Sequence, residues 1–223
     1  MSFKRLFDLA LAIPLFILSV PVIVVAGGLI LATDGWPVFY AQEREGLRGK
    51  PFTLWKLRTM KRGSGALLEE YLGRDPEARA EWERRFKLER DPRTLPAVGE
   101  FLRRSNIDEL PQFWNVLLGH MSLVGPRPFP RYHLERFSPE WRAERASVAP
   151  GVTGLWQVTA VEEDNLESQE RIDREYLARR SPGFDLLLLG LTAKKVLSGG
   201  RGMRLRAKGP AQPLVERGLH SPE

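Results

Sequence analysis

The sequence predicts an α+β fold that is mostly helical, with a small β-hairpin, an N-terminal re-entrant (kinked) membrane helix and interfacial amphipathic helices. Three observations lead to this prediction. A run of 25 residues between Asp8 and Asp34 carries no charge. Turn residues just after this run separate short stretches that favour strands. The later segments place charged and apolar residues at helical spacing.

The composition limits the chemistry that the chain can perform. It has 223 residues, no Cys and three His, which excludes disulfide frameworks, thiolate zinc sites and cysteine nucleophiles. The balance of 34 Lys and Arg against 28 Asp and Glu leaves a net charge of +6. A basic surplus indicates an anionic partner, and phosphate esters, anionic lipid and nucleic acid are the candidates.

Residues 1–34 form the predicted membrane segment. As a helix the uncharged run extends roughly 37 Å, more than a hydrocarbon core of ~30 Å requires. Pro14 and Pro21 each remove a helical hydrogen bond, so a kink is expected near the middle, where Ser19 can help to satisfy a freed carbonyl. A secretory signal and a straight spanning helix are the alternatives.

The flanking charges favour a segment that enters and leaves the membrane by the same face. Lys4 and Arg5 precede it, and seven Lys or Arg lie between residues 44 and 62. Basic residues prefer the cytoplasmic side. A helix broken at Pro21 places both ends there.

Residues 35–198 form the predicted cytoplasmic domain at the membrane interface. Gly46, Gly49 and Pro51 indicate a hairpin between residues 35 and 60. Helices are expected over residues 66–90, with an interruption at Asp75-Pro76, and over 98–104, 166–180 and 184–197. The basic, Gly/Pro-rich residues 199–223 are predicted to be a disordered, lipid-facing tail.

Two motifs combine residue types that suit phosphate chemistry. Asp108 and Glu109 lie within Ser105–Pro111, which is either a capping box begun by Ser105 or the approach to a helix that starts after Leu110. An ionised Asp is a competent nucleophile toward phosphorus. In Gly125-Pro126-Arg127-Pro128, two prolines fix the backbone around an arginine that suits bidentate phosphate contact, although a plain rigid turn gives the same pattern.

Several familiar motifs are absent. The chain has no GxGxxG, GxxxxGK[ST], HExxH, GxSxG or Asp-x-Asp. Dinucleotide enzymes, P-loop kinases, zinc proteases, serine hydrolases and the large nucleotide-sugar transferases are therefore unsupported.

Taken together, several segments resemble the bacterial sugar transferase family, the monotopic phosphoglycosyl transferases. They are FKRLFDL, the apolar run, FTLWKLRTM, DPRTLPAVGEFLRRSNIDELPQFWNVLLGHMSLVGPRP and APGVTGLWQV. The resemblance covers about residues 3–197. It implies that a sugar 1-phosphate passes from a UDP-sugar to a polyprenyl (undecaprenyl) phosphate with Mg²⁺, releasing UMP.

The resemblance also implies roles for individual residues. The family's nucleophilic Asp and its neighbouring Glu match Asp108 and Glu109. The expected phosphate-binding residues are Arg103, Arg127, Arg58 and Lys56, and the expected metal ligands are Asp108 and Asp173. For Asp173, a solvated helix face is the alternative.

The expected location is the cytoplasmic face of the bacterial inner membrane, with anionic lipid as a further partner and no nucleic acid. A homodimer is left open, and so is the sugar, because different hexoses need the same phosphate machinery. Two departures stand out: Val20-Pro21 replaces the Ser-Pro of many members, and residues 158–161 lack the Gly and Arg of Val-Ser-Gly-Arg. A membrane-anchored basic adaptor that binds anionic lipid and an inactive relative are the competing interpretations.

Overall fold

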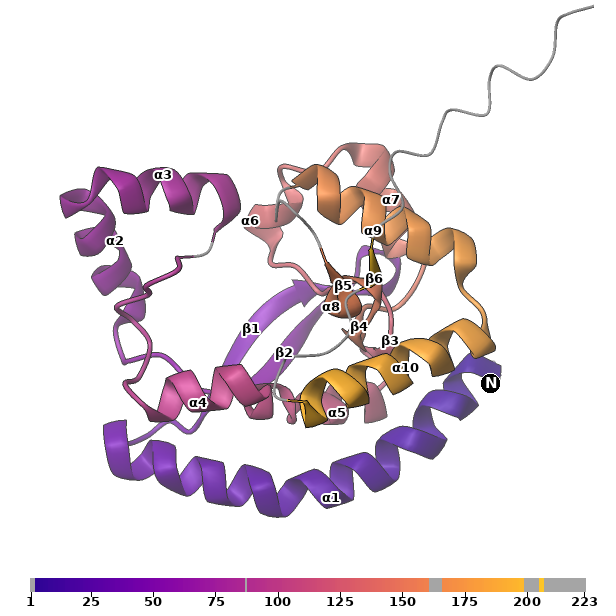
Figure 1. Ribbon diagram of the computed structural model, residues 1–223, viewed down its shortest axis with the longest axis horizontal. Helices are drawn as coiled ribbons and strands as arrows, with labels where there is room; N and C mark the ends of the chain where they lie inside the picture. The colour runs from indigo at the N-terminus through magenta and orange to yellow at the C-terminus, as the bar shows by residue number, and fades with distance from the viewer. Residues whose placement is uncertain (1–2, 87, 161–165, 199–204, 207–223) are drawn as a thin grey trace, which may run out of the picture.

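The computed structural model describes residues 3–86, 88–160, 166–198 and 205–206. Figure 1 shows the long N-terminal helix α1 curving along one side of the molecule, with helices α4, α5 and α10 between it and the strands. A pair of helices, α2 and α3, stands apart on the opposite side of the body. The fold is thus mostly helical with little sheet, as predicted.

Helix α1 spans Phe3–Asp34 and stays helical through both of its prolines. It bends as a continuous bow (Figure 1), so the predicted break at Pro21 does not appear as an interruption of the helix. Pro21 withdraws the helical donor from the carbonyl of Ile17, whereas the Ser19 hydroxyl donates to the carbonyl of Phe16 at 2.7 Å. Ser19 therefore does not replace the bond that Pro21 removes.

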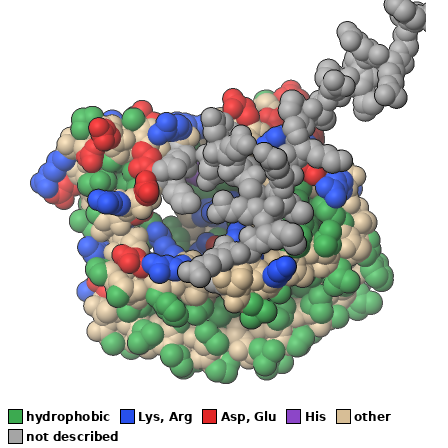
Figure 2. Space-filling model, in the orientation of Figure 1, with side chains coloured by type: hydrophobic (Ala, Val, Ile, Leu, Met, Phe, Trp, Pro, Cys, Tyr) green, Lys and Arg blue, Asp and Glu red, His purple; other side chains and the backbone are tan. Residues whose placement is uncertain are grey.

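The two faces of α1 differ in exposure. Its outer side chains include Ile17, Leu18 and Val25, which are 62%, 71% and 66% exposed. Its inner face buries Ala26 and Ile30 against side chains of β2 and α4. Within the described residues, α1 is the one helix long and apolar enough to cross a membrane by length and composition. Figure 2 shows apolar side chains gathered along this edge of the molecule.

Ionic contacts fasten the first turn of α1 to the body. The Lys4 ammonium lies 2.9 Å from a carboxylate oxygen of both Asp8 and Asp185. The Arg5 guanidinium donates to the carbonyls of Val116 and Leu117, at the end of helix α5. The two basic residues that precede the apolar run therefore have protein partners.

The hairpin forms where it was predicted. Strands β1 (Phe39–Glu45) and β2 (Pro51–Leu57) pair antiparallel, with Phe39 opposite Leu57, and the short turn η1 (Leu47–Gly49) connects them. The buried Asn115 side chain accepts from the Trp55 amide at 3.1 Å and donates to the Thr53 carbonyl at 2.6 Å. One amide side chain thus fixes α5 against β2.

The remaining elements are mostly helices, the longest of 16 residues, with two-residue or three-residue strands among them. They are α2 (Ser64–Arg74), α3 (Pro76–Arg85), α4 (Val98–Ser105), η2 (Ile107–Glu109), α5 (Gln112–Leu117), β3 (Ser122–Val124), α6 (Arg131–Leu134), α7 (Pro139–Ala146), β4 (Gly151–Thr153), α8 (Leu155–Val158), β5 (Thr159–Ala160), α9 (Leu166–Arg179), α10 (Pro182–Leu197) and β6 (Leu205–Arg206). Strands β3 and β4 pair in parallel, as do β5 and β6.

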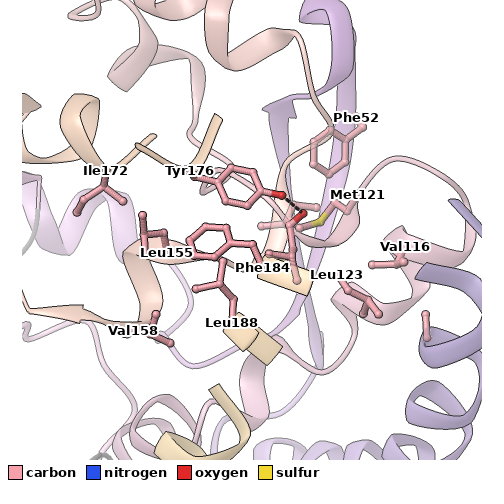
Figure 3. Packing of buried hydrophobic residues seen from close by; sticks show 13 residues of the cluster. Phe52, Val116, Met121, Leu123, Leu155, Val158, Ile172, Tyr176, Phe184 and Leu188 are labelled. Carbon is pink, nitrogen blue, oxygen red and sulfur yellow. Dashed lines mark hydrogen bonds between the residues drawn. The ribbon is translucent and has the colours of Figure 1, made fainter. Parts of the chain in front are cut away.

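The main core lies between α5, α9, α10 and the β3–β4 pair. Figure 3 shows Tyr176 and Phe184 at its centre, with the Tyr176 hydroxyl directed toward the strand backbone. That hydroxyl donates to the Val124 carbonyl at 3.1 Å. Ile172 and Tyr176 are buried on one face of α9, as its periodicity predicts.

Local sequence signals located most helix ends. Asp75 separates α2 from α3 and accepts from the amides of Glu77 and Ala78. Ser181 caps α10 by accepting from the amide of Phe184. The predicted tail, residues 199–223, lies outside the described residues apart from strand β6.

Candidate active site

The carboxylate pair lies in a tight connection between two helices. Helix α4 ends at Ser105, Asn106 adopts the left-handed conformation at φ 58°, and Asp108 and Glu109 follow in the single 3₁₀ turn η2. Helix α5 then begins at Gln112, just after Pro111. The capping-box interpretation of Ser105 is wrong, because Ser105 is the last residue of α4 and its hydroxyl donates back to Phe101.

Asp108 is buried, with a relative exposure of 8%. Burial raises the pKa of its carboxyl from 3.8 to about 6, and the nearby charge of Glu109 adds to this rise, while Lys56 and Arg103 oppose it. At neutral pH the carboxylate is ionised but poorly solvated. Such a group is more nucleophilic than an exposed carboxylate.

Glu109 has the opposite electrostatic environment. Burial acts to raise the pKa of its carboxyl, but the charge and hydrogen bond of Lys56 together with Arg127 hold that pKa below its usual value. The Lys56 ammonium lies 2.6 Å from Glu109 Oε1. Two adjacent carboxyl groups whose pKa values are shifted apart can take different roles in a reaction.

Arg103 comes from α4 and lies beside Asp108. Its Nε donates to the Thr59 hydroxyl at 2.9 Å and its Nη1 to the Thr94 hydroxyl at 3.2 Å. Gly99 permits this approach, because a Cβ at Gly99 would lie 2.5 Å from the Thr59 carbonyl oxygen. The side chain is exposed, and its hydrogen bonds go to neutral hydroxyl groups.

Arg127 lies on a loop that close backbone packing holds in place. Gly125, just after β3, meets Gly151 at the start of β4, and a Cβ on either glycine would collide with the facing backbone. The guanidinium of Arg127 stacks on the Trp156 indole, 4.7 Å from the ring centroid. Among the residues that the structure describes, the side chain of Arg127 has no hydrogen-bond partner, so its donors are available to an anion.

Arg58 makes its contacts outside the site that contains Asp108 and Glu109. Its guanidinium donates to the Asp34 carboxylate and to four carbonyls, those of Asp34, Gly35, Pro37 and Met60. These five bonds use all five of its N–H donors. Arg58 therefore ties the end of α1 to the strand region and has no donor left for phosphate in this structure.

The Asp173 carboxylate also makes its contacts away from the carboxylate pair. Its carboxylate accepts from Trp141 Nε1 at 3.2 Å and from Arg145 Nη1 at 2.7 Å, and it is 1% exposed. Arg145 in turn donates to the backbone carbonyl of Arg127. The buried pair thus supports the Arg127 loop, and the solvated-face alternative for Asp173 is wrong because the side chain is buried.

The site contains two residues that sequence reasoning missed. Arg44 on β1 interacts electrostatically with Arg127 and Glu109, and Trp156 supports Arg127 from α8. In the sequence, Arg44 is one of seven basic residues after the apolar run, so no local signal distinguishes it. Figure 2 shows a hollow on this face with Lys or Arg side chains in its wall.

The carboxylates of the site are candidate ligands for Mg²⁺. Within the described part of the chain, no group of three or more His, Cys, Asp or Glu gathers at one point. Mg²⁺ is commonly held by one or two carboxylates together with substrate phosphates and water. Asp108 and Glu109 fit such a site, with Asp108 the more available because Lys56 engages Glu109. Asp173, with both of its contacts in the core, does not fit.

The fold and the site define a class of protein: an α+β protein with an Asp-Glu pair and several cations, beside a helix apolar enough for a membrane. The chain belongs to the bacterial sugar transferase family, whose model matches residues 1–199. This confirms the resemblance seen in the sequence.

Three relatives illustrate the family. The undecaprenyl-phosphate galactose phosphotransferase of Salmonella typhimurium is 41% identical over 87% of this chain and 40% of its own length. The exopolysaccharide production protein ExoY of Sinorhizobium fredii is 35% identical over 86% of this chain and 84% of its own. The UDP-glucose:undecaprenyl-phosphate glucose-1-phosphate transferase of Klebsiella pneumoniae is 34% identical over 87% of this chain and 40% of its own length. The chain thus spans about two fifths of the first and third relatives.

Proposed function

We propose that this protein transfers a sugar 1-phosphate from a UDP-sugar to a polyprenyl (undecaprenyl) phosphate, giving polyprenyl diphosphate sugar and UMP. The observation that carries the proposal is the electrostatic contrast between Asp108 and Glu109, within a group of cations beside α1. Family membership and the names of the relatives support the substrate classes. The reaction is a first membrane step of polysaccharide or glycoconjugate assembly.

In the proposed first step, a carboxylate oxygen of Asp108 attacks the β-phosphorus of the UDP-sugar. A carboxyl–phosphorus bond forms, the bond from that phosphorus to the bridging oxygen breaks, and UMP leaves with the electron pair. In the second step, a phosphate oxygen of the polyprenyl phosphate attacks the same phosphorus and releases the Asp108 carboxylate. The covalent aspartyl intermediate lets one anion leave before the next enters.

The cations reduce the repulsion between an attacking carboxylate and the diphosphate. Arg127 presents its donors from the Trp156 ring, and Arg103 lies close enough to Asp108 to oppose the rise in its pKa. Lys56 holds Glu109 ionised and oriented, so that Glu109 can position Asp108 or a cation. Arg58 and Asp173 act at a distance through the fold.

A bound Mg²⁺ would be held by Asp108, with Glu109 nearby and phosphate oxygens of the substrate completing its ligands. It would neutralise charge on the diphosphate. The residues of this chain supply the nucleophile and the remaining positive charge.

The proposed location is the cytoplasmic face of the bacterial inner membrane. The apolar outer side of α1 supports membrane insertion, and a same-face entry and exit would place the site where a soluble nucleotide sugar meets a membrane-bound acceptor. Anionic lipid is a proposed partner of the basic surface. A basic adaptor is not favoured, because it gives no reason for the contrast between Asp108 and Glu109.

The test combines UMP release with intact-mass detection of the intermediate. Purified protein in nanodiscs is incubated with undecaprenyl phosphate, Mg²⁺ and each of several UDP-sugars. Asp108→Asn should lose both UMP release and the phosphosugar adduct, whereas Glu100→Gln, which neutralises an exposed acid on α4, should keep both. Turnover by Asp108→Asn near the wild-type rate would overturn the assignment of Asp108 as the nucleophile. If the wild type shows no turnover with any UDP-sugar, the result would favour the interpretation that the chain is an inactive relative of the family.

A further inference from the structure

Arg44 is a half-buried cation to which the fold supplies no carboxylate. Its Nη1 donates to the Pro128 carbonyl at 3.3 Å and its Nη2 to the Gln42 side-chain oxygen. Its Nε is buried and has no hydrogen-bond partner among the described residues. Both acceptors are neutral, and no ion pair within the described residues includes Arg44. A buried charge in a folded protein is normally paired, because its removal from water is costly.

The surroundings of Arg44 carry excess positive charge. Burial, together with the neighbouring charge of Arg127, lowers the pKa of Arg44 to about 10, while Tyr132, Tyr40 and Glu109 act in the opposite direction. The guanidinium is still protonated at neutral pH. Glu109 cannot balance both cations, because Lys56 already binds it at 2.6 Å. An added anion would therefore bind favourably between Arg44 and Arg127.

The position of Arg44 indicates which substrate supplies that anion. Arg44 lies on β1, which packs against β2 and α6, whereas α1 packs against α4, α5, β2, β3 and η2. Tyr132 of α6 faces the same guanidinium and is 46% exposed. The Arg44 side of the site therefore differs from the side on which α1 would bring a lipid acceptor. It suits the soluble nucleotide.

We propose that Arg44 and Arg127 together bind the diphosphate of the nucleotide sugar, with Arg44 as an anion-binding residue of the donor side. This assignment rests on the proposed function for the identity of the donor. The contact with the Pro128 carbonyl allows a second role for Arg44, positioning the Arg127 loop, and the test has to separate the two.

The test measures binding of UDP and of pyrophosphate to full-length protein in nanodiscs by calorimetry, which requires no turnover. Arg44→Gln removes the charge and leaves a shorter side chain with a neutral amide donor, whereas Arg44→Lys keeps both the charge and the length. We expect Arg44→Gln to weaken UDP binding roughly tenfold or more, since hydrogen bonds to charged groups contribute at this level. Arg44→Lys restores the charge but not the planar guanidinium with its two parallel donors, so it should recover part of the affinity for UDP.

Kinetic constants distinguish donor from acceptor. Arg44→Gln should raise KM for the UDP-sugar and leave KM for undecaprenyl phosphate within about twofold of wild type, since a charge lost on one side of the site affects mainly the ligand bound there. The matched control is Arg48→Gln, an exposed arginine in the turn of the same hairpin, which should bind UDP like wild type. Thermal unfolding verifies that each variant is folded, and Arg44→Lys replaces Arg44→Gln if the latter is not.

The outcomes separate this inference from the proposed function. UDP and pyrophosphate affinities of Arg44→Gln within twofold of wild type would overturn the role of Arg44, even if transfer occurs. The same holds if wild type binds neither probe. Arg44-dependent binding of UDP by a protein that forms no adduct would support the anion site and refute the transfer. Equal loss of affinity for both substrates would indicate the loop-positioning role in place of the donor contact.

Discussion

Burial of the Asp108 carboxylate predicts that the proposed nucleophile destabilises the fold at neutral pH. Its pKa is about 6 in the folded protein, against 3.8 for an unperturbed Asp. At about 1.4 kcal/mol for each pH unit, the difference corresponds to about 3 kcal/mol as an upper limit. We therefore expect Asp108→Asn to be more stable than wild type at pH 8 by about 1–3 kcal/mol, because the amide carries no charge to desolvate.

The sign of the pH dependence follows from proton linkage. Between pH 4 and 6 the folded protein holds a proton on Asp108 that the unfolded chain has lost, so wild-type stability falls as the pH rises through this window. Asp108→Asn lacks that dependence, so its advantage should shrink toward zero near pH 4. At pH 8 the gain corresponds to roughly 2–10 °C in Tm for a chain of this length.

The assay is thermal unfolding of full-length protein in nanodiscs at pH 8 and pH 4.5, with Glu100→Gln as the control. Glu100 is an exposed acid on α4, so its substitution should leave Tm unchanged at both pH values. An Asp108→Asn variant that is no more stable than wild type at pH 8 would refute the assignment of a desolvated, charged carboxylate.

Three further predictions follow from the same contacts. The rate of adduct formation should fall below about pH 6, as Asp108 becomes protonated, and a profile flat down to pH 4.5 would contradict this. Lys56→Met should raise the pKa of Glu109, since Lys56 is the main group holding it down, so activity should drop at neutral pH and partly recover at higher pH. Asp173→Asn should destabilise the fold by about 3–5 kcal/mol in denaturant titrations, because it leaves Arg145 charged and buried; an unchanged unfolding midpoint would exclude that pairing.

Local pattern predicted most of the secondary structure. Gly46 and Gly49 located the hairpin turn, and Asp75 the break between α2 and α3. These features depend on neighbours within a few residues, so the sequence is enough to reveal them. The capping box at Ser105 failed because two local signals competed, and Pro111 marked the true start of the next helix.

The grouping of the site residues was only partly predictable. Asp108, Glu109, Lys56, Arg103 and Arg127 lie together as expected. An arginine has the same local sequence signal whether its donors are free, as in Arg127, or all engaged, as in Arg58. The partners of an arginine come from distant segments of the chain, so its role is set by packing.

The sequence by itself determined the family, the apolar N-terminal segment and the acid pair, because each depends on residue type and short-range order. The tertiary structure decided how those groups are tuned. It buries Asp108, pairs Lys56 with Glu109, engages every donor of Arg58 between the end of α1 and the strand region, and leaves Arg44 without a carboxylate. Desolvation and charge pairing act over a few ångströms in space, between residues that are up to tens of positions apart in the chain.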